Sequence, residues 1–267
     1  MSEFYKPPYS SIEKLNSIGC DALTEVAARY GYGYEEADRD RSPDVRHLAY
    51  HNAQHSLRVR GAARQLAQLH HLSTFDEELV VTIASAHDLF HDGIDDEERS
   101  ADWLTERLAI GGFSEEDQEI ARLAVLGTTP IKDSDGEYVS QQFSLTQFPS
   151  ERAREVALCV AASDMEAIFA PHGPLVAHDL FRENNDIHES LQDLDISQLI
   201  SFQARQIHFV ESFHPLYPEL EQIFGGLRKE IVDHHKLLLG HLQSGEIRTW
   251  QEIYRSDIDF RERHSTS

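Results

Sequence analysis

The stretch STFDEELVVTIASAHDLFHDG, residues 73–93, decides the fold class of this 267-residue chain. Its apolar side chains recur at helical spacing, which predicts a helix that begins after Ser73 or Thr74 and continues into His87. A hydroxyl at the start can accept a hydrogen bond from a free backbone N–H, and the acidic residues that follow suit the positive end of a helix. Two histidines and two aspartates then follow within a few positions, so the same segment carries a candidate site.

Helical periodicity continues through most of the chain. It predicts further helices over residues 10–29, 51–72, 100–110, 114–127, 149–169, 196–213 and 216–243. Alternating patterns typical of strands are scarce, and no linker or repeat divides the chain. We therefore expect an all-α fold in a single domain over residues 1–267, with an N-terminal arm at about 1–10 and a short C-terminal tail at about 257–267. The polar stretch 128–148 is expected to be a long loop.

Composition disfavours several classes of function. Asp and Glu outnumber Lys and Arg by 47 to 24, which gives a formal net charge of −23. Such a surface repels phosphate backbones, so we expect neither a polymeric nucleic-acid partner nor a membrane partner. The longest apolar runs are far short of a membrane span, and the N-terminal residues lack the pattern of a signal peptide. The two cysteines form no CxxC pattern, so we expect a cytoplasmic protein without a cysteine-based zinc site. A single disulfide and the oligomeric state stay open.

Histidines and aspartates gather in three segments. His51 and His55 lie one turn apart on one predicted helix face, and His87 and His91 repeat that spacing. Asp164 ends an apolar run, where a carboxylate needs a partner because an unpaired buried charge is very costly. Imidazole and carboxylate ligands together suit divalent cations, which lower the pKa of bound water and stabilise charge on a phosphoryl oxygen. These segments therefore favour a divalent metal site.

The order of these residues resembles the HD superfamily of metal-dependent phosphohydrolases, whose signature is H…HD…D. Here His55 is followed after 31 residues by His87-Asp88 and, after a further 75, by Asp164. The resemblance implies a helical HD-type domain in which these four residues hold one or two divalent ions of Mn, Mg, Zn, Fe or Ni. The alternative from the residues alone is that His87 caps a helix while Asp164 forms a buried salt bridge.

Two motifs are similar to those of class I cyclic-nucleotide phosphodiesterases. YHNAQH at residues 50–55 resembles YHNxxH, and HDLFHDG at residues 87–93 resembles HDxxHxG. The resemblance implies that His51 protonates the departing oxygen. It also implies that Asp88 bridges to a second ion, and that His91 takes part in the network of water around the metal.

A third similarity lies further along the chain. QIHFV at residues 206–210, followed by HPL at 214–216, is similar to the QxxFI…PL stretch of the same family. The resemblance implies that Gln206 reads the edge of a purine and that Phe209 stacks on the base, with Asn52 also among the substrate-binding residues. Gln206 and Phe209 are one turn apart and share a helix face. The alternative is that Phe209 is an ordinary core residue and Gln206 a solvated one.

The acidic segment DDEERSA, residues 95–101, resembles the NEERSA segment of small bacterial predicted HD phosphohydrolases. The resemblance implies that Glu98 faces the site and holds water or a second ion there. Asp92 matches the last aspartate of the HDxxED pattern of alarmone hydrolases, which would place it near the site too. The alternative is the solvated start of a helix, where acidic residues are favoured, and we prefer that interpretation for Glu97.

The sequence thus predicts a metal-dependent phosphohydrolase that cleaves a small phosphoester, above all a nucleotide or cyclic-nucleotide phosphodiester, with His51 as the general acid. Two alternatives stay open: a non-catalytic HD domain that senses a nucleotide, and a di-iron oxygenase of the HD type. The oxygenase is disfavoured because no histidine occurs between Asp92 and Asp164. The adjacent pairs His70-His71 and His234-His235 are expected to be background, since neighbours on a helix point in different directions.

Overall fold

The computed structural model describes residues 10–32, 48–132, 134, 138–184, 191, 194–213 and 217–265. In this part of the chain the α-helices are α1 (Ser11–Tyr30), α3 (Ala53–Leu69), α4 (Thr74–Ala86), α5 (Asp96–Gly111), α6 (Glu115–Gly127), α7 (Glu151–Asp164), α8 (Gly173–Asn184), α9 (Ile196–Phe213), α10 (Pro218–Ile223), α11 (Arg228–Ser244) and α12 (Trp250–His264). Two short strands, β1 (Pro130–Lys132) and β2 (Tyr138–Gln141), and two 3₁₀ turns, η1 (Gln142–Leu145) and η2 (Glu166–Ile168), complete the described elements. The predicted all-α fold class is confirmed.

Helix α4 lies inside a group of helices formed by the first part of the chain. Every residue from Glu78 to Ala86 is buried, because α4 packs against α1, α3 and α7. Ser73 accepts a hydrogen bond from the backbone N–H of Asp76, so the cap lies where the sequence predicts it. Helices α5 and α6 pack on each other, and α6 packs on α7 to extend the same core.

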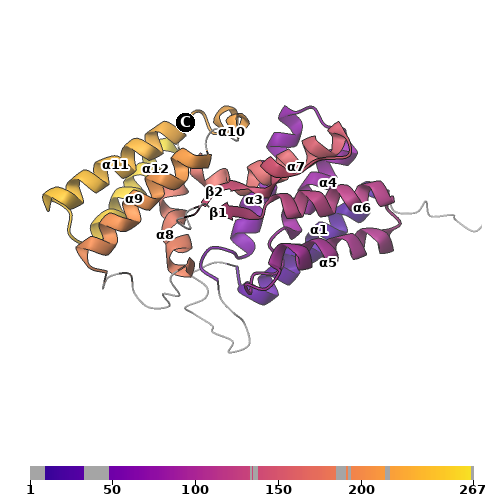
Figure 1. The fold of residues 1–267 in the computed structure, drawn as a ribbon, viewed down its shortest axis with the longest axis horizontal. Coiled ribbons are helices and arrows are strands. Elements are labelled where there is room, and N and C mark those ends of the chain that lie inside the picture. Colours follow the sequence, from indigo (N-terminus) through magenta and orange to yellow (C-terminus); the bar gives the residue numbers. More distant parts are fainter. Residues whose placement is uncertain are drawn as a thin grey trace, which may run out of the picture.

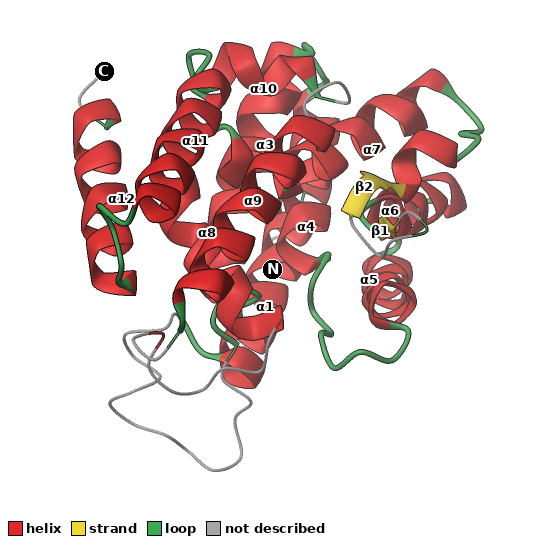
Figure 2. Cartoon of the chain, turned by 60° about the vertical axis from the view of Figure 1, so that its left-hand side comes forward, coloured by secondary structure: helices red, strands yellow, loops and turns green. Residues whose placement is uncertain are grey.

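A second group of helices follows in the chain. Helices α8, α9, α11 and α12 lie together on one side of the molecule in Figure 1, and α1 and α4–α7 on the other. The core of the second group contains Leu199, Phe202, Leu238, Trp250 and Ile253. Figure 2 shows α12 on the outside, next to α11. Because β2 packs on α9 while η1, which follows β2, packs on α6, the hairpin and η1 together contact both groups.

Four expected boundaries are wrong. The single helix expected over residues 216–243 is two helices, α10 and α11, separated at residues 224–227. Residues 257–264 are not a tail but the end of α12, where Asp257 and Phe260 are buried; Thr249 begins this helix with a capping box. The segment 128–148 is not an irregular loop, because it contains the antiparallel β1–β2 hairpin and η1. The helix expected over 149–169 ends at Asp164. Residues 1–9, in the expected N-terminal arm, and residues 214–216 lie outside the described residues.

No helix in the described part of the chain combines the length and the apolar character that crossing a membrane requires. Both cysteines are free thiols: Cys20 is exposed and Cys159 is buried. Burial raises the pKa of Cys159 to about 12, so this thiol stays protonated and unreactive.

Candidate metal centre

The four residues that the sequence suggests as metal ligands come from three helices whose ends meet. His55 lies in the first turn of α3, because the Asn52 side chain caps that helix. His87 and Asp88 follow directly after α4, and Asp164 is the last residue of α7.

Polar atoms of these four residues converge on one point. Asp88 Oδ2 lies 3.1 Å from His55 Nε2 and 3.0 Å from His87 Nε2. Asp164 Oδ1 lies 3.4 Å from each of the same two nitrogens. Both histidine side chains are completely buried, whereas each carboxylate keeps a small exposed fraction. The cluster is therefore buried on its histidine side and accessible on its aspartate side.

Most of the converging atoms lack a hydrogen bond. His55 Nε2, His87 Nε2 and Asp88 Oδ2 are buried, and no described residue gives any of them a hydrogen bond of acceptable geometry. Asp88 Oδ2 lies at ion-pair distance from the two nitrogens, 3.1 and 3.0 Å, but without a well-aligned hydrogen bond. An unsatisfied buried polar group costs about 1–3 kcal/mol, so a single partner between them would stabilise all three. A divalent cation would be that partner, because it accepts imidazole nitrogen and carboxylate oxygen together. The donor set fits such an ion.

Neighbouring groups fix the orientation of two of these residues. His87 Nδ1 donates a hydrogen bond to the carbonyl oxygen of Ala84 at 2.9 Å, which leaves Nε2 as the nitrogen that faces the cluster. Asp164 Oδ2 accepts a hydrogen bond of 2.9 Å from Gln141 Nε2, and the Tyr217 hydroxyl donates to Gln141 Oε1. Partners of this kind orient metal ligands. Sequence reasoning missed Gln141, because it lies in the segment expected to be a loop.

The charges of the cluster support one another when no cation is present. Burial alone would lower the pKa of His87 and raise that of Asp88, since burial penalises either charge. Their mutual attraction outweighs burial, so the pKa of His87 lies well above its ordinary value and that of Asp88 well below. The pKa of His55 is likewise raised, and that of Asp164 lowered. A cation at this point would replace protons on the imidazoles.

A second group of side chains lies next to this cluster. His51 Nδ1 contacts Glu183 Oε1, and His91 Nε2 lies 3.2 Å from the same oxygen. The two imidazole rings stack with centroids 3.7 Å apart. His51 Nε2 is 4.0 Å from Asp88 Oδ2, so the other edge of His51 faces the cluster of His55, His87, Asp88 and Asp164. The structure thus brings His51 and His91 together as the sequence suggests, but it holds both through Glu183.

Sequence reasoning also missed Glu183. It lies on α8, more than a hundred positions from His51, and no motif in the sequence marks it. Burial raises its pKa, but the charge of His51 and the hydrogen bonds from both histidines outweigh burial, so the pKa of Glu183 is lowered and the carboxylate stays charged. The same hydrogen bond and the charge of Asp88 raise the pKa of His91 against the opposing effect of burial.

Three predicted site residues are not part of either cluster. Asn52 is buried and uses its side chain as the α3 cap, with Nδ2 donating to the carbonyl groups of Leu48 and Ala49. Asp92 is exposed and pairs with Arg99 at 2.6 Å. Glu98 is exposed at the start of α5, whereas its neighbour Glu97 lines the cleft described below. Burial raises the pKa of Glu97.

A cleft with about 830 Å³ of empty space opens above the two clusters. Its walls include His51, His91, Asp88, Glu97 and Phe209. A second, smaller chamber with about 450 Å³ of empty space continues from it, because Tyr50, Asp164, Met165, Leu180 and Phe209 line both. We call this second space the inner chamber.

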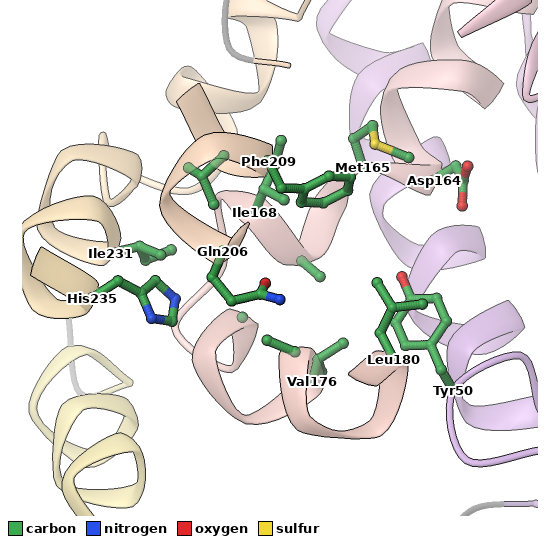
Figure 3. A pocket seen from close by; sticks show the side chains of 14 residues that line it. Tyr50, Asp164, Met165, Ile168, Val176, Leu180, Gln206, Phe209, Ile231 and His235 are labelled. Carbon is green, nitrogen blue, oxygen red and sulfur yellow. The ribbon is translucent and has the colours of Figure 1, made fainter. Parts of the chain in front are cut away.

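The inner chamber contains the two residues proposed from the third motif. Gln206 and Phe209, both on α9, line it together with apolar side chains such as Val176 and Ile231. Figure 3 shows Phe209 beside Met165, toward Asp164, and Gln206 deeper in the chamber, next to His235. The two residues thus face the same space as Asp164. They can do so because they are three positions apart on α9 and share one face of that helix.

Comparisons with known proteins add one structural similarity. No family model and no curated protein matches the chain. Among solved structures, the crystal structure of a Lactobacillus plantarum protein that was a structural-genomics target has a TM-score of 0.47 and 18% sequence identity, over 84% of this chain and 95% of that one. A similarity at this level says nothing about function.

Proposed function

We propose that the protein is a metal-dependent phosphohydrolase that cleaves a small phosphoester, with a nucleotide or cyclic-nucleotide phosphodiester as its preferred substrate. The observation that carries this proposal is the convergence of His55, His87, Asp88 and Asp164, three of whose four converging atoms are buried without a hydrogen bond. The resemblance of the sequence to the HD superfamily points to the same four residues. A divalent ion bound to them would neutralise charge on a phosphoryl group and make a water molecule acidic.

His51 is positioned to move a proton at the edge of this cluster. Its Nδ1 is engaged by Glu183, so Nε2 is the nitrogen that faces Asp88 and the cleft. A protonated His51 can donate from Nε2 to the oxygen that departs from phosphorus, and the Glu183 carboxylate compensates the positive charge of the ring. His91 packs flat against His51, which restricts the orientation of the ring.

The charge of the cleft favours a diester over a monoester. The residues that line it in the described part of the chain include Asp88, Asp96, Glu97 and Asp164, and no Lys or Arg. A diester carries one negative charge at neutral pH and a monoester carries nearly two, so the monoester is repelled more strongly. The apolar inner chamber offers space for the uncharged part of such a substrate.

The proposal is tested by hydrolysis assays on protein loaded in turn with Mn²⁺, Zn²⁺, Mg²⁺, Fe²⁺ and Ni²⁺. The substrates are 3′,5′-cyclic nucleotides, mononucleotides and bis(p-nitrophenyl) phosphate. We expect diester hydrolysis with at least one metal and its loss in the presence of a chelator. Full activity in chelator, or no hydrolysis of any substrate with any metal, contradicts the proposal. Tight nucleotide binding without turnover would instead indicate a sensing domain.

A further inference from the structure

The adjacent histidines on α11 lie in different surroundings. His234 Nε2 is 2.6 Å from Asp257 Oδ1 and so ties α11 to α12. His235 Nδ1 is 2.7 Å from Gln203 Oε1 on α9, and the ring of His235 lines the inner chamber. Because neighbours on a helix point apart, one histidine of the pair holds the helices together while the other reaches a cavity.

The hydrogen bond from Gln203 decides which nitrogen of His235 carries the proton. The carbonyl oxygen Oε1 can only accept, so His235 Nδ1 donates to it. Burial lowers the pKa of His235 to about 4, and the ring is therefore neutral at pH 7. A neutral ring with a proton on Nδ1 has a lone pair on Nε2. Among the described residues none forms a hydrogen bond with this Nε2.

A second polar side chain, that of Gln206, lines the same chamber near His235. Gln206 and His235 are neighbours at the end of the inner chamber that is far from Asp164 (Figure 3). The Gln206 amide likewise forms no hydrogen bond with any residue in the described ranges. The surrounding wall is apolar and includes Val176, Phe209 and Ile231. An apolar chamber with a few convergent polar groups is the usual form of a small-molecule site.

We propose that His235 determines the specificity of the inner chamber, where its Nε2 accepts a hydrogen bond from an amino group on the edge of a flat nitrogen heterocycle. Gln206 supplies one further donor and one further acceptor beside it. This pattern fits a 6-aminopurine, whose amino group has two N–H bonds. A 6-oxopurine would direct a carbonyl oxygen at the lone pair of His235 and leave both acceptors unpaired. The proposal rests on the proposed function in one respect: that function supplies the phosphoester to which the heterocycle would be attached. The binding of the heterocycle itself does not depend on it.

The test is calorimetric binding of adenosine and inosine to the purified protein. These nucleosides carry no phosphate, so the measurement does not depend on metal or turnover. We expect adenosine to bind at least about tenfold more tightly than inosine, the factor that one unpaired buried group produces. In His235→Phe, which keeps a ring but has no acceptor, the preference should fall below about threefold. His208→Phe, on the exposed side of α9, is the matched control and should keep the preference.

A second variant reverses the chemistry of the same nitrogen. In Gln203→Glu the new carboxylate has nearly the shape of the amide and accepts the same Nδ1 proton, while its negative charge favours a protonated ring. Nε2 then becomes a donor, and we expect inosine to bind more tightly than adenosine. Circular dichroism and thermal unfolding establish which variants are folded.

Three results would overturn the proposal: equal affinity of the wild-type protein for both nucleosides, an unchanged preference in folded His235→Phe, or an unchanged preference in folded Gln203→Glu. Any of these leaves the phosphohydrolase proposal intact, because no hydrolysis is measured. Conversely, a protein that shows the expected preference and its reversal but hydrolyses no phosphoester would contradict the proposed function alone.

Discussion

Glu183 holds His51 from two directions. Its Oε2 accepts hydrogen bonds from the backbone N–H groups of Tyr50 and His51, at 2.9 and 3.1 Å, while its Oε1 contacts Nδ1 of the His51 ring. One carboxylate therefore fixes both the backbone and the side chain of the proposed general acid. Because α8 carries Glu183 and α3 follows His51, this contact also joins the two groups of helices at the cleft.

Glu183→Gln is expected to reduce turnover by about 10²–10⁴-fold, the range of general acid–base catalysis, because a neutral amide cannot compensate a protonated His51. Bound metal, measured by elemental analysis, should be unchanged, since Glu183 is not among the four converging ligands. Glu119→Gln, at an exposed position of α6, is the control and should keep full activity. Wild-type turnover in Glu183→Gln would refute the role of this carboxylate.

His51→Ala and His87→Ala should separate catalysis from metal binding. His51 Nε2 is 4.0 Å from Asp88 and belongs to the neighbouring group, so His51→Ala should lose activity but keep metal. His87→Ala and Asp88→Ala remove converging ligand atoms and should lose both. The measurement pairs metal content with turnover for each purified variant. Equal metal loss in His51→Ala and His87→Ala would contradict the assignment of His55, His87, Asp88 and Asp164, without His51, as the metal ligands.

Gln141→Leu is expected to weaken metal binding by about 10–100-fold, the usual cost of removing a partner that orients a ligand. Asp164 would lose the hydrogen bond that holds its Oδ2, and the Tyr217 hydroxyl would lose its acceptor. Competition with a chromogenic chelator measures the affinity. Gln142→Leu, at the next position, serves as the comparison, because no hydrogen bond joins Gln142 to Asp164. A metal affinity equal to that of the wild-type protein would show that the hydrogen bond from Gln141 is not needed to orient Asp164.

The sequence was informative about those parts of the site that local periodicity brings together. His51 and His55 share a helix face, and the apolar periodicity before His87 marks the end of α4, so their placement could be predicted. The helical fold class followed from the same periodicity, and so did the shared face of Gln206 and Phe209.

The missed residues depend on packing between distant elements. Glu183 on α8 contacts His51, and Gln141 at the end of β2 contacts both Asp164 and Tyr217. No spacing in the sequence records these long-range contacts. The sequence also did not indicate that the Asn52 side chain caps α3. Nor did it predict the ion pair that Asp92 forms with Arg99 in the first turn of α5.

Removal of the metal should lower the stability of the fold, and the affinity for the metal should depend on pH. Without a cation the pKa values of His55 and His87 are raised, so protons compete with the metal for both Nε2 atoms. Affinity should therefore fall as the pH is lowered, and binding at pH 7 should release protons into a weakly buffered solution. Thermal unfolding with and without chelator measures the change in stability. Calorimetry in buffers of different ionisation enthalpy measures the release of protons. Binding without proton release would contradict this account of the cluster.

His235 should make the folded state less stable in mild acid. Its pKa is about 4 in the folded protein against an ordinary value of 6.5, so between these values the unfolded state binds more protons. Stability is therefore lost as the pH falls from about 6.5 toward 4, by about 2 kcal/mol between pH 7 and pH 5. Asp257 does not contribute, because hydrogen bonds from His178 and His234 outweigh burial and hold its pKa at about 2. Urea unfolding at both pH values should show a smaller loss in His235→Phe than in the wild-type protein. An identical loss in both would mean that His235 takes up a proton as easily in the folded as in the unfolded chain.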